Sequence, residues 1–333
     1  MEQIPVILLS GFLGSGKTTF LNHLVADAKD KNIFVIMNEY GDISIDAELL
    51  YEIDDEKIYE INSNCMCCVG TNELKTTFGR VITLMEQNRI RIDHIVIELS
   101  GLAEPWPIIQ TITETPFLSD YFYIDSVYTL LDTVNGLKQL SKYPELKKQL
   151  LYADSILLTK AEDLANVDPD LMNQIRVINP FAPVELLALT GENYKNYFDR
   201  NLFGQKPRDF EENLKSSLLN QETHHHDHSS HHHSDISNFV LRVPGTLSTK
   251  QIEKWLVELI KRYEDQLVRF KGIIAVEGYD HQLILQGVNT WYQLNKGRQW
   301  QEDEILQSII VIIGHQIDRD EVEALLLTEE LDG

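Results

Sequence analysis

The first two hundred residues alternate short apolar runs with longer segments of helical length. Most of the runs are rich in Val, Ile and Leu without clean alternation, which is typical of strands buried on both faces of a sheet. The predicted strands cover residues 4–10, 33–38, 57–61, 94–100, 128–132, 155–160 and 183–189, and the predicted helices include 17–30, 71–88 and 141–153. We therefore expect an α/β domain with a mostly parallel, doubly wound sheet.

The pattern changes at residue 212, where a polar stretch of low complexity runs to residue 235. Such a stretch buries little apolar surface, so we expect a flexible linker there. Beyond it the pattern predicts strands at 239–243, 268–277, 281–288 and 307–313 and helices at 249–262 and 318–328, which together indicate a smaller α+β domain. The predicted domains are 1–205 (α/β), 206–237 (linker) and 238–330 (α+β).

Charge and hydropathy argue against two classes of binding partner, nucleic acids and membranes. The 333 residues include 52 acidic and 29 Lys or Arg residues, which gives a net charge of −23. A field of that sign repels phosphate backbones, so we expect no nucleic-acid partner. No apolar run approaches the roughly 18 residues of a membrane span, so we expect no membrane insertion. The N-terminus lacks the basic and small-residue features of a signal peptide, and we expect a cytoplasmic protein.

A phosphate-binding motif follows the first predicted strand. Residues 11–18, GFLGSGKT, fit G-x-x-x-x-G-K-[ST] and open a predicted helix. The glycines let backbone N–H groups close around phosphates, while Lys17 supplies a positive charge to the β- and γ-phosphates. The Thr18 hydroxyl is the predicted Mg²⁺ ligand. The predicted nucleotide-binding residues of this loop are Gly11, Gly14, Ser15, Gly16, Lys17, Thr18 and Thr19.

Two later strand ends complete the predicted nucleotide site. Glu98 ends one strand, where many P-loop proteins place a carboxylate near the Mg²⁺ shell, and Gly101 is positioned to offer its amide to the γ-phosphate. Thr159 and Lys160, in LLTKAED, fit the Asn/Thr-Lys-x-Asp tetrad with which GTPases bind guanine. The fourth position is Glu162, whose carboxylate can make the same bidentate contact as aspartate. The sequence therefore predicts a preference for guanine.

All three cysteines of the chain lie in NCMCC, at positions 65, 67 and 68. The clustering suggests a metal site, a redox pair, or a buried polar turn without a ligand. Thiolates suit Zn²⁺ and Cu⁺, and Cys65, Cys67 and Cys68 leave a fourth coordination position open. A carboxylate, a histidine or water could fill it, and Glu39 and Asp42, in NEYGD, are candidates. With Glu98, they are also candidate catalytic residues, because their segment occupies the position of a γ-phosphate-sensing switch.

The polar stretch contains seven of the eleven histidines of the chain. Neutral imidazoles bind Zn²⁺, Ni²⁺, Co²⁺ or Cu²⁺, so these side chains form either a weak accessory metal site or a solvated linker that binds metal incidentally. They are His224, His225, His226, His228, His231, His232 and His233.

Several motifs together resemble one known family. LLSGFLGSGKTTFLNHL, MNEYGDISID, NCMCC, VIELSGLAEP and LLTKAED are similar to the CobW/YjiA-type GTP-binding metallochaperones, the zinc-regulated GTPase metalloprotein activator type. LVRFKGIIAVEG and VIIGHQID resemble the C-terminal domain of that family. The resemblance implies a GTPase that binds metal at a C-x-C-C motif, with a histidine-rich linker in many members. Asn64 before the first cysteine and Glu162 in the tetrad depart from the usual pattern.

The leading hypothesis is a GTPase with GTP, Mg²⁺ and Zn²⁺ as its cofactors. It would hydrolyse GTP to load a divalent metal onto a client metalloprotein, with zinc as the leading candidate for that metal. It would also form a nucleotide-dependent homodimer. Intrinsic turnover should be slow, because no arginine finger in cis is evident. One alternative is a zinc-buffering protein whose nucleotide controls assembly. The other is a P-loop small-molecule kinase, which would yield a phosphorylated product in place of free phosphate.

Overall fold

The computed structural model describes residues 3–39, 51–52, 58–64, 71–187, 193–204, 236–301 and 303–327. The chain divides into two compact units. The first comprises Met1–Arg176 and Ala182–Gln205, and the second Val177–Phe181 and Lys206–Gly333. No helix that the structure describes is both long and apolar enough to cross a lipid bilayer.

The first unit is built on a sheet of eight strands within the described residues, in the order β3-β4-β2-β5-β1-β6-β7-β8. Neighbouring strands are parallel throughout, except for the antiparallel pair of β3 and β4 at one edge. This confirms the predicted parallel α/β class. The strands are β1 (Ile4–Gly11), β2 (Ile33–Glu39), β3 (Tyr51–Glu52), β4 (Ile58–Asn64), β5 (His94–Glu98), β6 (Phe122–Asp132), β7 (Ser155–Thr159) and β8 (Val184–Leu186).

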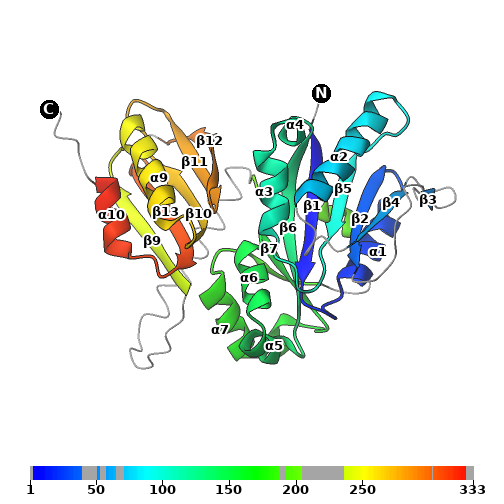
Figure 1. Cartoon of the computed structure of the whole chain (residues 1–333). Coiled ribbons are helices and arrows are strands. Elements are labelled where there is room, and N and C mark those ends of the chain that lie inside the picture. Colours follow the sequence, from blue (N-terminus) through cyan, green and yellow to red (C-terminus); the bar gives the residue numbers. More distant parts are fainter. Residues whose placement is uncertain are drawn as a thin grey trace. The chain divides into compact units, whose positions relative to one another are not determined.

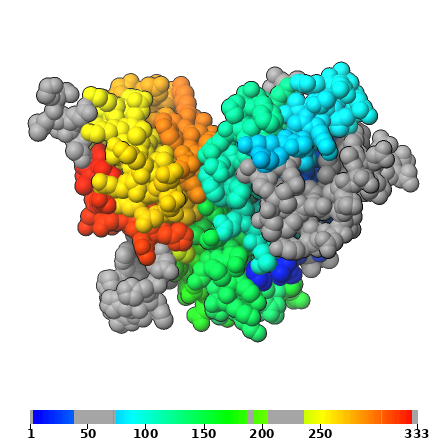
Figure 2. Space-filling view, viewed as in Figure 1, coloured from blue at the N-terminus to red at the C-terminus, as the bar shows by residue number. Residues whose placement is uncertain are grey.

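Helices cover both faces of this sheet (Figure 1). Helix α1 places Phe20 and Leu24 in a core with Ile7 and Leu9 of β1. Helix α3 contacts β6, and α6 contacts both β6 and β1. Figure 2 shows α2 and α3, in cyan to blue-green, on the near surface of the unit. The helices are α1 (Lys17–Asp27), α2 (Thr71–Glu86), α3 (Trp106–Glu114), α4 (Pro116–Ser119), α5 (Gly136–Lys142), α6 (Pro144–Tyr152), η1 (Leu164–Asn166), α7 (Pro169–Ile178) and η2 (Tyr194–Tyr197).

One predicted helix, 141–153, was wrong in its extent. The segment belongs to two helices, α5 and α6, which meet at Tyr143. Pro144 is the first residue of α6, a position that a proline tolerates, and in the interior of a longer helix it would remove a hydrogen bond and clash.

The second unit carries a five-stranded antiparallel sheet in the order β12-β11-β10-β13-β9 within the described residues. Helix α9 begins at a capping box formed by Ser248 and Gln251, and it buries Trp255 and Leu256 in the core of this unit. The elements are β9 (Ile236–Pro244), α9 (Thr249–Tyr263), β10 (Leu267–Ile274), β11 (His281–Val288), β12 (Trp291–Gln299), β13 (Gln307–His315) and α10 (Arg319–Leu327), which confirms the predicted α+β class.

Candidate functional site

The phosphate loop connects the end of β1 to the start of α1. Gly11 has φ of 136° and Gly16, the N-cap of α1, has φ of 97°, which L side chains rarely adopt. A Cβ at Gly11 would also lie 2.4 Å from the carbonyl oxygen of Leu130 on β6. The loop therefore requires glycine at both ends, and it directs backbone N–H groups of the α1 N-terminus to the point where an anion can bind.

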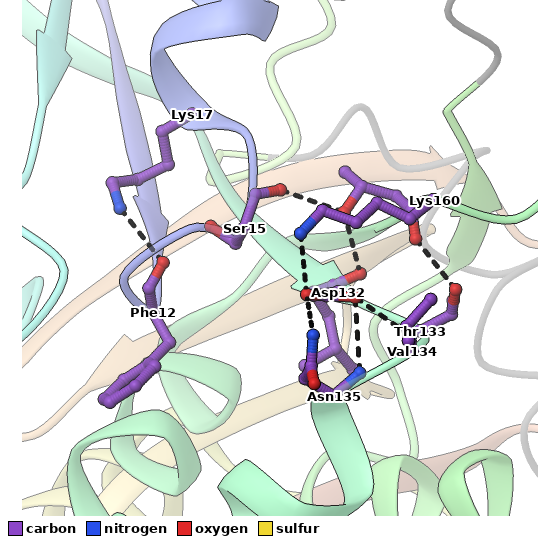
Figure 3. A network of polar contacts seen from close by, with 10 residues as sticks. Phe12, Ser15, Lys17, Asp132, Thr133, Val134, Asn135 and Lys160 are labelled. Carbon is purple, nitrogen blue, oxygen red and sulfur yellow. Dashed lines mark hydrogen bonds and ion pairs between the residues drawn. The ribbon is translucent and has the colours of Figure 1, made fainter.

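Lys17 is held within this loop. Its Nζ donates hydrogen bonds to the backbone oxygens of Gly11, at 2.7 Å, and Phe12, at 3.3 Å (Figure 3). Burial lowers the pKa of Lys17, and the negative charge of Glu98 opposes that shift. Because the ammonium group is largely removed from water, its interaction with an anionic ligand is stronger than that of an exposed lysine.

Thr18 and Glu98 meet across the two central strands. β5 lies beside β1, with Leu9 in register with Glu98, so the carboxylate reaches the start of α1. Thr18 Oγ1 donates a 2.8 Å hydrogen bond to Glu98 Oε1. A hydroxyl and a carboxylate at this distance supply the hard oxygen atoms that Mg²⁺ prefers, so the residues present fit that ion.

The turn after β5 touches the phosphate loop. A Cβ built on Gly101 would lie 2.6 Å from the backbone nitrogen of Leu13, which leaves no space for a side chain. The backbone N–H of Ala103 bonds the oxygen of Ser100 at 3.0 Å and closes the turn. Gly101 thus lies directly against the loop that the sequence assigns to phosphate.

The end of β7 reaches the same loop from the other side. Thr159 Oγ1 donates to the backbone oxygen of Ser15 at 2.9 Å, and Lys160 has a left-handed φ of 63° (Figure 3). Glu162 is exposed. The next carboxylate, Asp163, accepts the N–H of Ala165 at 3.0 Å and caps η1. Asp163 therefore has a local structural role, and Glu162 points its charge to solvent at the fourth tetrad position.

Asp132 is a residue of this site that the sequence reasoning missed. At the end of β6, its Oδ2 accepts from Lys160 Nζ at 2.8 Å and from Asn135 Nδ2 at 2.8 Å, and its Oδ1 accepts the N–H of Val134 at 2.9 Å (Figure 3). Burial acts to raise the pKa of Asp132, but the hydrogen bonds from Asn135 and Lys160 outweigh it, so the pKa is lowered. The signal that could have found it is the one used for Glu98, a carboxylate ending a buried strand.

Twelve of the predicted site residues lie at the carboxyl ends of β1, β5 and β7 and the start of α1. Glu39 is the last residue of β2, the neighbour of β5. Asp42, the three cysteines and the seven linker histidines lie outside the described residues. Within the described ranges, no group of three or more His, Cys, Asp or Glu side chains is placed to hold a metal ion. The twelve are Gly11, Gly14, Ser15, Gly16, Lys17, Thr18, Thr19, Glu98, Gly101, Thr159, Lys160 and Glu162.

Comparison with known proteins identifies the family of both units. Residues 5–185 match the family model for the CobW/HypB/UreG nucleotide-binding domain, and residues 236–328 match the cobalamin synthesis protein CobW C-terminal domain. The chain belongs to the CobW family. It is 32% identical to the zinc chaperone YjiA of Escherichia coli, over 97% of this chain and 98% of that one. It is 25% identical to the zinc-regulated GTPase metalloprotein activator 1 of Saccharomyces cerevisiae, over 98% of this chain and 83% of that one.

Solved structures in this family have the same fold. The crystal structure of the Zn(II)-bound YjiA GTPase from E. coli aligns with a TM-score of 0.70 at 28% identity, covering 98% of each chain. A Zn(II)-bound triple mutant of the YjiA GTPase aligns with a TM-score of 0.76, again at 28% identity and 98% coverage of both chains. The CobW family membership predicted from the motifs is therefore confirmed over both units.

Proposed function

We propose that this chain is a GTPase of the zinc chaperone type, which hydrolyses GTP to GDP and phosphate and delivers zinc to a client metalloprotein. The proposal of GTP hydrolysis rests on the 2.8 Å hydrogen bond from Thr18 to Glu98, directly beside the buried Lys17. The named relatives, a zinc chaperone and a zinc-regulated GTPase metalloprotein activator, support the metal half.

Each residue of the site has a definite task in this proposal. Lys17 leaves the carbonyl groups of its loop and neutralises the β- and γ-phosphates. Thr18 and Glu98 would hold Mg²⁺, which when bound would supply charge neutralisation at the phosphates. Gly101 presents its amide to the γ-phosphate. Thr159 fixes the base-binding segment to the phosphate loop, and guanine is recognised by the Lys160 and Glu162 side chains that follow.

Zinc is the cargo of the proposed reaction. Cys65, Cys67 and Cys68 are its proposed ligands, and Glu39 or Asp42 would occupy the fourth position until a client ligand replaces it. The linker histidines are a weaker accessory set. The reducing cytoplasm keeps such thiols available, so we place the protein there. A nucleotide-dependent homodimer remains part of the proposal.

The phosphate half is tested by release of free phosphate from GTP. Lys17→Ala should abolish hydrolysis while the protein stays folded, because the Lys17 side chain acts on phosphate oxygens. Near-normal phosphate release by a folded Lys17→Ala protein would contradict the assignment, and a phosphorylated small molecule in place of free phosphate would favour the kinase alternative.

The zinc half is tested by a zinc competition titration with GDP and with a non-hydrolysable GTP analogue. Cys67→Ser should weaken the tightest site, and the nucleotide should change wild-type zinc affinity by roughly 5–150-fold, the usual range of coupling between two sites. Equal zinc affinity in both nucleotide states would leave the buffering alternative ahead, and unchanged tight binding in Cys67→Ser would remove that cysteine from the ligand set.

A further inference from the structure

Gln149, on α6, is a buried polar side chain without an obvious place in the site described above. It is 0% exposed, and its neighbours in α6 that are buried include Leu146 and Leu150. Burial of a primary amide is costly unless its polar atoms are paired. A leucine or methionine would suit such a position in an ordinary helix, so the contacts of this glutamine need an explanation.

The amide nitrogen of Gln149 holds the turn after β5. Its Nε2 donates to the backbone oxygens of Gly101, at 3.1 Å, and Ala103, at 3.0 Å. Both neighbours are carbonyl groups that can only accept, so the orientation of the amide is fixed by chemistry and cannot be reversed. The side chain therefore makes two hydrogen bonds to the turn, one on either side of Leu102.

The amide oxygen of Gln149 has no such role. Oε1 is buried and makes no hydrogen bond within the described part of the chain. A buried polar atom left unpaired costs about 1–3 kcal/mol. A residue selected for stability alone would avoid that cost. The two hydrogen bonds that Gln149 donates to the turn therefore indicate a role other than stability.

Other contacts fix the position of α6, and therefore the position from which Gln149 bonds the turn. Lys148 Nζ lies 2.6 Å from Glu104 Oε1, just after the turn. The backbone oxygen of Gln149 accepts from Thr129 Oγ1 of β6 at 3.1 Å. Tyr143, which precedes α6, places its ring 4.5 Å from the ring of Phe12 in the phosphate loop, centroid to centroid. The helix is thus anchored to the sheet and the loop while it holds the turn.

We infer that Gln149 is a positioning residue for the γ-phosphate contact of Gly101. Fixing the oxygens of Gly101 and Ala103 fixes the planes of the two peptide groups that begin at these residues, because a peptide group is planar. The Gly101 N–H belongs to the preceding peptide group, whose oxygen on Ser100 accepts the N–H of Ala103. With the peptide groups on both sides of Gly101 held, this N–H is oriented before nucleotide binds, which lowers the cost of reaching the reactive geometry. This inference rests on the proposed GTPase function.

The test compares Gln149→Met with wild type in steady-state GTP hydrolysis. Methionine keeps the length and volume of glutamine, fills the position and removes both donors. The turn acts on the γ-phosphate, so we expect kcat to fall about 10- to 100-fold. GDP has no γ-phosphate, so its affinity should stay within about twofold, since a twofold change is only about 0.4 kcal/mol.

Gln139→Met is the matched control. Gln139, on the neighbouring helix α5, also has a buried side-chain oxygen without a hydrogen bond in the described residues. The Gln139→Met substitution makes the same chemical change as Gln149→Met but away from the turn, so kcat should be unaltered. An unaltered kcat in Gln149→Met overturns the inference. Equal losses of GTP and GDP binding in that variant also overturn it, because they show a structural role only.

A measurement on the wild-type protein covers the case in which Gln149→Met does not fold. Hydrogen exchange of the peptide that spans residues 100–104 should slow with a non-hydrolysable GTP analogue relative to GDP, because the pre-oriented Gly101 N–H then donates to the γ-phosphate. Identical exchange in the two states overturns the inference, whereas absence of any GTP hydrolysis by wild type overturns the proposed function itself.

Discussion

Replacing Gly101 by alanine introduces one methyl group where the turn meets the phosphate loop. That methyl carbon would lie 2.6 Å from the backbone nitrogen of Leu13 and 2.6 Å from its Cγ and Cδ2. Leu13 is 57% exposed, so its side chain can rotate away. Its backbone nitrogen can move only with the phosphate loop, so the substitution must separate the two segments.

The structure sets the size of the effect. Overpacking of this kind costs about 1–3 kcal/mol. In a unit of this size each kcal/mol lowers the melting temperature by about 2–4 °C, so the expected fall is about 2–12 °C. Hydrolysis of GTP should fall by more than about tenfold, because a displacement near 1 Å at the reacting groups has effects of that order or larger.

The assay is calorimetric melting together with phosphate release, and α2 offers a matched control. Gly79 lies within that helix, and a Cβ there would meet no atom within 4 Å. Gly79→Ala should raise stability by about 0.8–1.0 kcal/mol from helix propensity, with normal hydrolysis. The double variant Gly101→Ala with Leu13→Ala should recover only part of the stability, because the backbone clash remains.

Two results would refute the reasoning about Gly101. Wild-type melting and wild-type hydrolysis in Gly101→Ala would show that the turn and the loop are not in contact in solution. Full recovery in the double variant would show that only the leucine side chain, and not the loop backbone, opposes the methyl group.

Three further predictions follow from the site and its surroundings. Glu162→Ala should reduce the preference for GTP over ATP more than Asp163→Ala does, in competition binding, because Asp163 caps η1; the reverse order would move the tetrad by one residue. Deleting residues 224–233 should lower total zinc capacity and leave hydrolysis and the tightest site unchanged, and loss of that site would make the histidines the primary ligands. Burial raises the pKa of Asp125 to about 6. The folded state therefore binds more protons than the unfolded state between the ordinary pKa of 3.8 and about 6, and stability falls as pH rises through that window. Asp125→Asn should flatten this fall in melting experiments across pH 4–7, and an unchanged slope would contradict it.

The features predicted well from the sequence are those whose cause is local. The phosphate loop was readable because its glycines and Lys17 lie within eight residues between a strand and a helix. Glu98 was readable because a carboxylate ends a run of buried apolar residues. The break between α5 and α6 was also marked locally, by Pro144, but the helical spacing on both sides hid it.

Features that depend on tertiary contacts could not be predicted from the sequence. Strand β12, WYQLNKGRQ, is an edge strand with mostly polar residues, and its pairing with β11 decides its structure. Gln149 lies 48 residues from Gly101, and nothing in the sequence of α6 marks a glutamine among leucines as a contact of that turn. Asp132 and Lys160 are 28 residues apart and meet only because β6 and β7 are neighbours.

These tertiary contacts connect the two ends of the nucleotide site. Asp132, which holds Lys160 on the guanine side, also binds Asn135, the N-cap of α5. Tyr143 is the C-cap of α5 and the N-cap of α6, and α6 carries Gln149, which bonds the oxygen of Gly101 on the proposed γ-phosphate side. On the proposed assignments, base binding would restrain this helix pair near Asp132, and γ-phosphate binding would restrain it through Gly101. Coupling between two binding events is reciprocal, so a γ-phosphate that orders the turn must strengthen the hold on the base by the same factor. The contacts through α5 and α6 would then join the two parts of the proposed site that have to distinguish GTP from GDP and from ATP.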